Sequence, residues 1–189
     1  MEALLTSAAL VALAEIGDKT QLLALVLAAR FRKPVPVIMG ILVATLANHA
    51  LAALLGATAA SWLEGPWFAF AVAVSFIVMG LWTLIPDTLD EDDEPKTSGS
   101  AFIATTIAFF IVEMGDKTQL ATVALGARFD ATVLVTMGTT IGMLLANAPV
   151  VLLGDKLLQR VPMKAVHIAA ALLFIAVGGW MLASQGLPF

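Results

Sequence analysis

Residues 14–22 read AEIGDKTQL, and residues 112–120 read VEMGDKTQL, almost the same sequence again. The second stretch follows the first at a constant shift of 98 positions, which places Glu15 on Glu113. Further landmarks obey the same shift: Arg30-Phe31 and Arg128-Phe129, Met39-Gly40 and Met137-Gly138, Leu55-Gly56 and Leu153-Gly154, Gly80 and Gly178, and Trp82 and Trp180. Matches spread over so much of the chain predict an internal duplication.

The composition indicates a membrane protein. Of the 189 residues, 60% are hydrophobic and only 13% are charged, whereas a soluble domain has about 45–50% apolar and about 25% charged residues. Six continuous apolar runs are each long enough to cross a bilayer: 3–29, 35–60, 66–86, 101–127, 131–153 and 163–183. Because a bilayer admits only helices or closed barrels, and these runs do not alternate, we expect an all-α fold of six transmembrane helices.

The duplication divides these helices into two sets of three. We expect repeat 1 over residues 1–86, an acidic cytoplasmic linker over 87–100, and repeat 2 over 101–189. Three spans are an odd number, so the second repeat must cross the membrane in the opposite sense to the first. Such inverted-topology repeats are typical of secondary transporters, whose substrate site lies near the membrane midplane where the repeats meet.

Basic residues in the short loops predict the orientation. All but one lie in the loops after the first, third and fifth runs: Arg30, Arg32, Lys33, Lys96, Lys156, Arg160 and Lys164 against Arg128 on the other side. The positive-inside rule therefore places both termini outside the cytoplasm, on the periplasmic side of a bacterial inner membrane. The linker is either a solvated hinge or a funnel that concentrates cations. The first run lacks a basic n-region and is too long for a signal peptide.

Several classes of chemistry are excluded by composition. The absence of Cys removes disulfides, thiolate metal ligands and Cys nucleophiles. A net charge of −4 and few Lys and Arg residues argue against nucleic acid as a partner. The lipid bilayer is an expected partner, and a homo-oligomer remains open.

Each repeat carries acids near the midpoint of its first apolar run, namely Glu15 with Asp18 and Glu113 with Asp116. Ionisable groups at bilayer depth cost a few kcal/mol or more each, so they indicate function. Within a helix, residues three apart share a face. We therefore predict that the pseudo-two-fold axis brings the two acid pairs together as a metal site.

Neighbouring polar residues would support this site: Lys19, Thr20, Gln21, Lys117, Thr118, Gln119, Asn48 and Asn147. Four carboxylates and two lysines leave a formal charge of −2, which one divalent cation neutralises. Without the ion, repulsion and desolvation favour protonated carboxyls, so metal and protons compete for the same oxygens. An all-oxygen ligand set favours hard ions such as Mn²⁺, Ca²⁺ or Mg²⁺.

Two alternatives remain open for these residues. Glu15 with Lys19 and Glu113 with Lys117 are i,i+4 pairs, which could neutralise each other within one helix as a structural network. Gly17 and its equivalent at 115 allow either close helix approach or a local break that frees backbone carbonyls.

The asparagines are ambiguous in a different way. Asn48 and Asn147 are 99 positions apart, so either the repeat slips by one residue or His49 is the equivalent of Asn147. Each asparagine could cap the site or bond a neighbouring helix. His49 is more often a packed, hydrogen-bonded histidine than a metal ligand in such a setting.

The doubled Glu-x-Gly-Asp-Lys-Thr motif, at 15–20 and 113–118, resembles the signature of the Gdt family of cation transporters. That family includes the Golgi transmembrane-protein-165 type and bacterial manganese exporters, and it belongs to the lysine-exporter superfamily. The resemblance covers essentially the whole chain. It implies transport of Mn²⁺ or Ca²⁺ in exchange for H⁺, with no cofactor and with the four acids carrying the ion. For so compact a chain it implies a manganese exporter of the bacterial inner membrane.

Two rival functions compete with cation transport. Intramembrane aspartyl proteases also pair two Asp residues from separate helices, but they need neither two further carboxylates nor adjacent lysines, so we do not expect an enzyme. An exporter of amino acids or small organic cations of the lysine-exporter type is the stronger alternative. Four crowded acids suit a compact divalent ion better than an organic amine.

Overall fold

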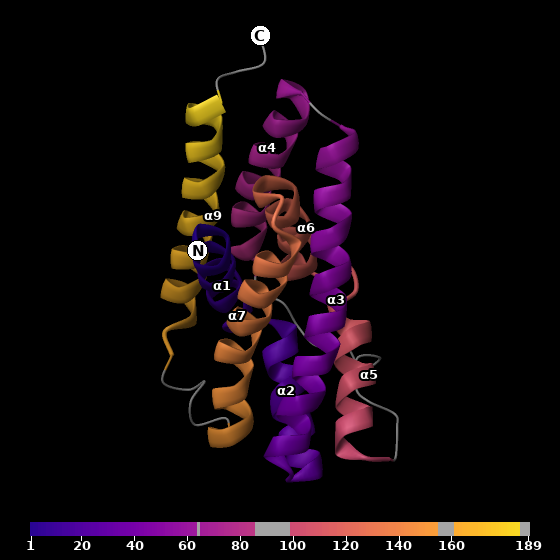
Figure 1. The fold of residues 1–189 in the computed structure, drawn as a ribbon. Helices are drawn as coiled ribbons and strands as arrows, with labels where there is room; N and C mark the ends of the chain where they lie inside the picture. Colours follow the sequence, from indigo (N-terminus) through magenta and orange to yellow (C-terminus); the bar gives the residue numbers. More distant parts are fainter. Residues whose placement is uncertain (64, 86–98, 155–160, 186–189) are drawn as a thin grey trace.

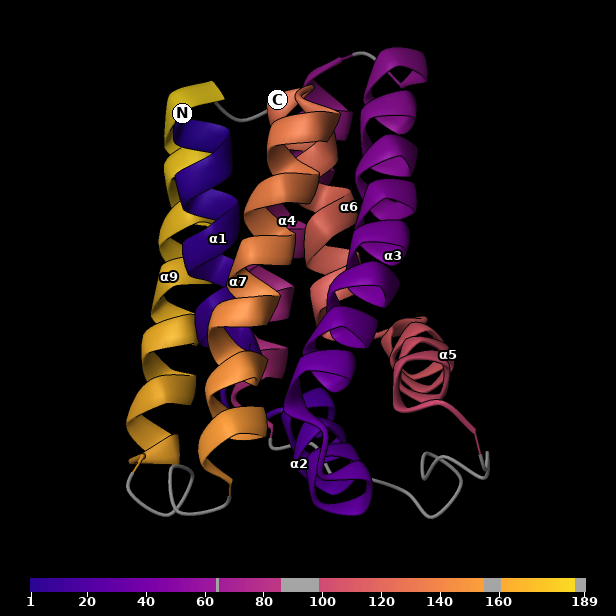
Figure 2. The same ribbon diagram turned by 60° about the horizontal axis from the view of Figure 1, so that its bottom comes forward.

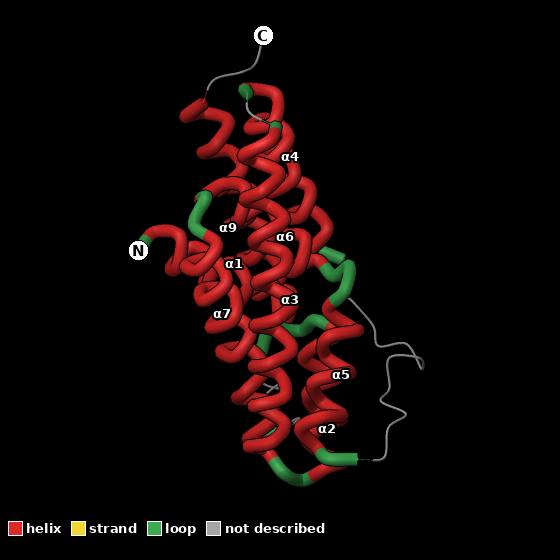
Figure 3. The backbone as a smooth tube through the Cα atoms, turned by 45° about the vertical axis from the view of Figure 1, so that its right-hand side comes forward, coloured by secondary structure: helices red, strands yellow, loops and turns green. Residues whose placement is uncertain are grey.

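Eight helices make up the described part of the chain, which comprises residues 1–63, 65–85, 99–154 and 161–185 of a computed structural model (Figure 1). In chain order they are α1 (Glu2–Glu15), α2 (Lys19–Phe31), α3 (Pro34–Trp62), α4 (Pro66–Thr83), α5 (Ala101–Glu113), α6 (Lys117–Phe129), α7 (Thr132–Leu153) and α9 (Met163–Gln185). Helices and loops alone appear over these residues, so the all-α prediction is confirmed for them (Figure 3). Of the predicted linker 87–100, all but residues 99 and 100 lies outside the described residues.

Four of the helices are long and apolar enough to cross a membrane: α3, α4, α7 and α9. They coincide within a few residues with the predicted runs 35–60, 66–86, 131–153 and 163–183. Proline at the start of α3 and α4 suits a helix N-terminus, because its missing N–H would be unpaired there anyway. These four runs are thus confirmed as helices, and each is a candidate membrane span by its length and composition.

The runs 3–29 and 101–127 are not the continuous helices that we expected. The first divides into α1 and α2, and the second into α5 and α6. Gly17 with φ +87° and Gly115 with φ +80° adopt the left-handed conformation that interrupts an α-helix. Each piece has only 13 or 14 residues, about 20 Å of helix, which is shorter than the roughly 30 Å hydrocarbon core. Of the two alternatives for these glycines, the structure therefore shows the local break.

Equivalent helices of the two halves pack in equivalent pairs. Helix α1 lies against α7 as α5 lies against α3, and α4 packs against its own equivalent α9 (Figure 2). Small residues allow this close approach. A Cβ at Gly138 would lie 2.5 Å from the Leu4 carbonyl oxygen between α7 and α1, and one at Gly40 would lie 2.9 Å from the Phe102 carbonyl oxygen between α3 and α5.

The two halves differ in how their broken helices contact the rest. Helix α6 packs on α4 and α1 packs on α9, whereas the equivalent pairs α2–α9 and α5–α4 have no comparable interface among the described residues. Helices α2 and α5 contact each other in the lower part of Figure 1, as their equivalents α6 and α1 also do. The α6 side is therefore more enclosed than the α2 side.

Candidate metal centre

Each helix break is built from the same sequence of backbone conformations. A glutamate ends the first helix, an apolar residue is extended, a glycine is left-handed, and an extended aspartate becomes the N-cap of the next helix. The residues are Glu15-Ile16-Gly17-Asp18 and Glu113-Met114-Gly115-Asp116. A glutamine four residues after each glycine closes the turn, since its Oε1 accepts the glycine N–H at 2.9 Å and 2.6 Å.

Three carboxylates from the two breaks converge. Glu15, Glu113 and Asp116 each offer an oxygen, and these oxygens all lie within 4.8 Å of one another. Both glutamates are fully buried, and Asp116 is 4% exposed. Acids from two distant parts of the chain thus surround one point, an arrangement that a metal ion or shared protons can stabilise.

Asp18, the fourth predicted ligand, lies outside this group although it is also buried. Its Oδ1 is 3.7 Å from the Lys117 Nζ. Asp116 in turn lies 3.5 Å from the Lys19 Nζ. The two ion pairs therefore cross between the halves, and each break supplies the lysine for the other break's aspartate. The helix breaks separate the i,i+4 partners that the structural alternative assumed.

Hydroxyl and amide groups surround the acids. Thr20 donates its hydroxyl hydrogen bond to Glu15 Oε2, and Thr118 donates to Asp116 Oδ2 at 3.1 Å. The oxygens of Gln21 and its equivalent at 119 accept from the glycine N–H groups, so these glutamines hold the breaks closed rather than presenting their oxygens to the acids.

The structure assigns different positions to the two asparagines. Asn147 Nδ2 lies 3.5 Å from Glu15 Oε2 and donates to the Met143 carbonyl at 3.1 Å. Asn48 instead donates to the Phe110 carbonyl at 3.5 Å and accepts from a glutamine, Gln119. Asn147 therefore contacts the acid group, and Asn48 bonds the neighbouring helix.

The repeat shift of 98 holds here without a slip. His49 is the equivalent of Asn147, and its Nε2 lies 3.4 Å from Glu113 Oε2 just as the amide lies beside Glu15. His49 is fully buried. We expected a packed histidine at this position and missed its contact with the acid. The exact shift of 98 was the sequence signal that could have found it.

Several polar atoms at this point make no hydrogen bond within the described residues. They are Glu15 Oε1, both Glu113 carboxylate oxygens, both His49 ring nitrogens and Asn147 Oδ1. Buried acceptors normally find a partner, because leaving one unpaired costs about 1–3 kcal/mol. Their concentration around one point favours a site that a cation or protons complete.

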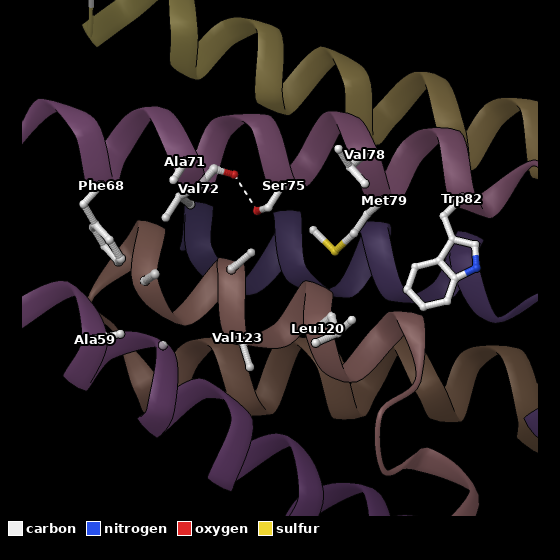
Figure 4. A pocket seen from close by; sticks show the side chains of 13 residues that line it. Ala59, Phe68, Ala71, Val72, Ser75, Val78, Met79, Trp82, Leu120 and Val123 are labelled. Atoms are coloured by element: carbon white, nitrogen blue, oxygen red, sulfur yellow. Dashed lines mark hydrogen bonds between the residues drawn. The ribbon is translucent and has the colours of Figure 1, made fainter. Parts of the chain in front are cut away.

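A pocket of about 400 Å³ between α3, α4 and α6 is a different kind of space (Figure 4). Its 13 lining residues carry no charge and include Phe68, Met79 and Trp82. The Ser75 hydroxyl already donates to the Val72 carbonyl at 2.6 Å. This pocket therefore offers nothing that would hold an ion.

The fold and the buried acids define a helical membrane protein with one acidic site built from both halves of the chain. The chain belongs to the GDT1 family, described as Divalent cation/proton antiporter GDT1, which it matches over residues 3–91 and 101–187. It is thus a transporter and not an enzyme, and metal ions are its transported substrates rather than cofactors.

Individual relatives agree with this assignment. The chain is 52% identical over 176 residues to a Vibrio cholerae protein named "Putative manganese exporter", covering 93% of this chain and 88% of that protein. It is 30% identical over 212 residues to GDT1-like protein 5 of Arabidopsis thaliana, with 91% of each chain covered. GDT1-like protein sll0615 of Synechocystis is 27% identical over 198 residues, covering 90% of this chain and 93% of that protein. No solved structure shows significant similarity to the chain.

Proposed function

We propose that this protein exports Mn²⁺ across a bacterial inner membrane in exchange for protons, and that Glu15, Glu113 and Asp116 hold the ion. The convergence of three buried carboxylates from two distant helix breaks is the observation that carries this proposal. The manganese relative at 52% identity supports the choice of ion, and Ca²⁺ is the second candidate substrate.

The proposed architecture is six spans in two inverted repeats, residues 1–86 and 101–189. The pairs α1–α2 and α5–α6 would each form one broken span. Support comes from identical breaks in the two halves, from equivalent helix pairings and from separate family matches over 3–91 and 101–187. Both termini would face the periplasm, in accordance with the basic loops.

The helix ends favour a cation at the centre. Helices α1 and α5 both end at the glutamates of the site. The C-terminal end of a helix carries a partial negative charge, and broken helices in transporters use such ends to coordinate cations. Four acids and two lysines leave −2 at the centre, which matches one divalent ion.

Protons would compete with the metal for these oxygens. Exchange of two protons for one divalent ion would leave the charge unchanged, so the pH gradient and the metal gradient would drive transport while the membrane potential does no work. In the opposite-facing state, the pseudo-symmetry would exchange the roles of the two aspartates, with Asp18 joining the glutamates and Asp116 pairing with a lysine alone.

Proteoliposome flux tests this function. A pH gradient should drive Mn²⁺ uptake into proteoliposomes that contain the purified protein. Glu113→Gln should abolish this uptake, because the amide carries neither the negative charge nor the exchangeable proton. Glu2→Gln is the matched control, since Glu2 is exposed at the N-terminus and should leave the flux unchanged. Full Mn²⁺ flux in Glu113→Gln would refute the assignment.

Export of a small organic cation remains the alternative for the same site. It would require room for an amine with its carbon chain, whereas the oxygens of the group lie within 4.8 Å of one another. Lysine in large excess should therefore fail to inhibit Mn²⁺ flux. Strong inhibition together with lysine uptake would favour the alternative.

A further inference from the structure

His49 is a buried polar side chain that the site described so far leaves without a function. It lies on α3, has no solvent exposure and places Nε2 at 3.4 Å from Glu113 Oε2. Neither ring nitrogen makes a hydrogen bond to any described residue. A histidine that served packing alone would be expected to bond a backbone or side-chain partner.

The equivalent position in the other half shows that the fold does not require an imidazole here. Asn147 on α7 occupies this position beside Glu15, and its amide bonds both that acid and the Met143 carbonyl. The two glutamates of the site therefore have different neighbours. Glu15 faces an amide, whereas Glu113 faces an aromatic nitrogen donor.

We propose that His49 Nε2 binds the transported ion next to Glu113, which makes the substrate a transition-metal dication in preference to Ca²⁺ or Mg²⁺. This inference rests on the proposed function, because it names the ion class of the same site. Two donor atoms about 2.1 Å from one ion and at neighbouring coordination positions lie about 3 Å apart, close to the observed 3.4 Å.

The ligand chemistry supports the same choice. Ca²⁺ and Mg²⁺ take oxygen ligands almost exclusively, whereas imidazole suits first-row transition metals. A mixed set of carboxylates and one imidazole therefore separates Mn²⁺ from the far more abundant alkaline-earth ions. A neutral imidazole also adds a ligand without changing the charge of −2 that balances a divalent ion.

Pulsed EPR of bound Mn²⁺ tests this inference directly in the full-length wild-type protein, purified without a histidine tag. We expect Mn²⁺ to show hyperfine coupling to a coordinated nitrogen, and labelling the two histidines with ¹⁵N should change that coupling. Mn²⁺ bound without nitrogen coupling would overturn the role of His49 and leave the proposed function standing. Failure to bind Mn²⁺ would overturn both.

Substitution then identifies the histidine and measures its effect. His49→Asn copies the other half and should remove the nitrogen coupling. It should also lower the preference for Mn²⁺ over Ca²⁺ in competition titrations by about 10- to 100-fold, the range for losing a group around a metal. His167→Asn, at the second histidine of the chain, should keep both the coupling and the preference.

A structural role for His49 predicts a different pattern. In that case His49→Asn would weaken Mn²⁺ and Ca²⁺ binding by the same factor, which would contradict the inference. The variant Asn147→His provides a second readout, since a nitrogen beside Glu15 should raise the preference for Mn²⁺ and add a second coupled nitrogen. An unchanged preference in that variant would count against imidazole as the source of selectivity.

Discussion

The breaks at 15–21 and 113–119 have nearly the same sequence and the same backbone, yet they stand in different surroundings. The Lys117 side chain is 8% exposed and donates to the Ile85 carbonyl at 3.1 Å, whereas the Lys19 side chain is 24% exposed. Asp116 joins the acid group and Asp18 does not. One sequence motif can therefore occupy two environments when different helices pack around it.

If the protein alternates between two states as we propose, its two halves must differ in their contacts in each state. If every contact were the same in the two halves, the acidic site would be equally accessible from both sides of the membrane. Helix α6 packs on α4 and its Lys117 side chain is buried, while α2 lacks the matching contact with α9 among the described residues. The glycines show the reverse, because Gly17 lies beside α9 and the space at Gly115 is open. The comparison between the halves can be tested at four levels, taken in order of decreasing effect.

Removing the enclosed lysine should have the largest effect on stability. Lys117→Met leaves Asp18 buried without the ammonium that faces it at 3.7 Å, which costs about 3–5 kcal/mol. Lys19→Met also removes an ammonium from a buried carboxylate, Asp116, but the Lys19 side chain is 24% exposed, so we expect a smaller loss than in Lys117→Met. Thermal unfolding in detergent without added Mn²⁺ would compare the two variants. Equal losses would show that the two breaks are energetically alike.

Replacing each aspartate of the breaks by asparagine should give two variants with different Mn²⁺ affinities. Asp116→Asn removes a member of the converging group and should weaken equilibrium binding by about 10- to 100-fold. Asp18→Asn should weaken binding less but still stop flux, because the opposite-facing state needs it. EPR titration of free Mn²⁺ measures the first effect and proteoliposomes the second. Equal affinities in the two variants would contradict the proposal that Glu15, Glu113 and Asp116, without Asp18, hold the ion in the described structure.

Alanine substitution at the two glycines of the breaks should lower stability by modestly different amounts. Gly17→Ala and Gly115→Ala both force alanine into a left-handed conformation, at about 1–2 kcal/mol each. Gly17→Ala should cost more, because its Cβ would lie 3.0 Å from Met163 Sδ and His167 Nε2, whereas the space at Gly115 is open. The readout is the melting temperature, at about 2–4 °C per kcal/mol for a chain of this size. Gly179→Ala, inside α9 with open space around it, is the control and should not destabilise.

Asn48→Ala, which copies the residue at the equivalent position of the other half, should have the smallest effect on stability. Ala146 is its equivalent, and there Gln21 donates to the backbone carbonyl at 2.9 Å. In Asn48→Ala, Gln119 can donate to the carbonyl of residue 48 in the same way, so we expect a loss of about 0.5–1.5 kcal/mol. A larger loss in thermal unfolding would mean that the asparagine has no such substitute.

Much of the fold could be predicted because its signals are local. Four apolar runs became single helices within a few residues of their expected ends. The run 3–29 divided at Gly17, because the apolar pattern on both sides is continuous and only the left-handed conformation of one residue interrupts it. The four acids of the two motifs are buried, as expected for charged groups in so apolar a chain, which must be buried together or paired.

By itself, the sequence determined that the chain is helical and that four acids and two lysines stand at equivalent positions of two similar segments, since composition and spacing are properties of the chain alone. Only the tertiary structure decided which of these charges meet. The lysines cross between the halves, three acids converge, and His49 faces Glu113. Such contacts depend on the rotation and depth of each packed helix. Close approach at glycines helps to set these at the α1–α7, α3–α5, α3–α6 and α4–α9 interfaces.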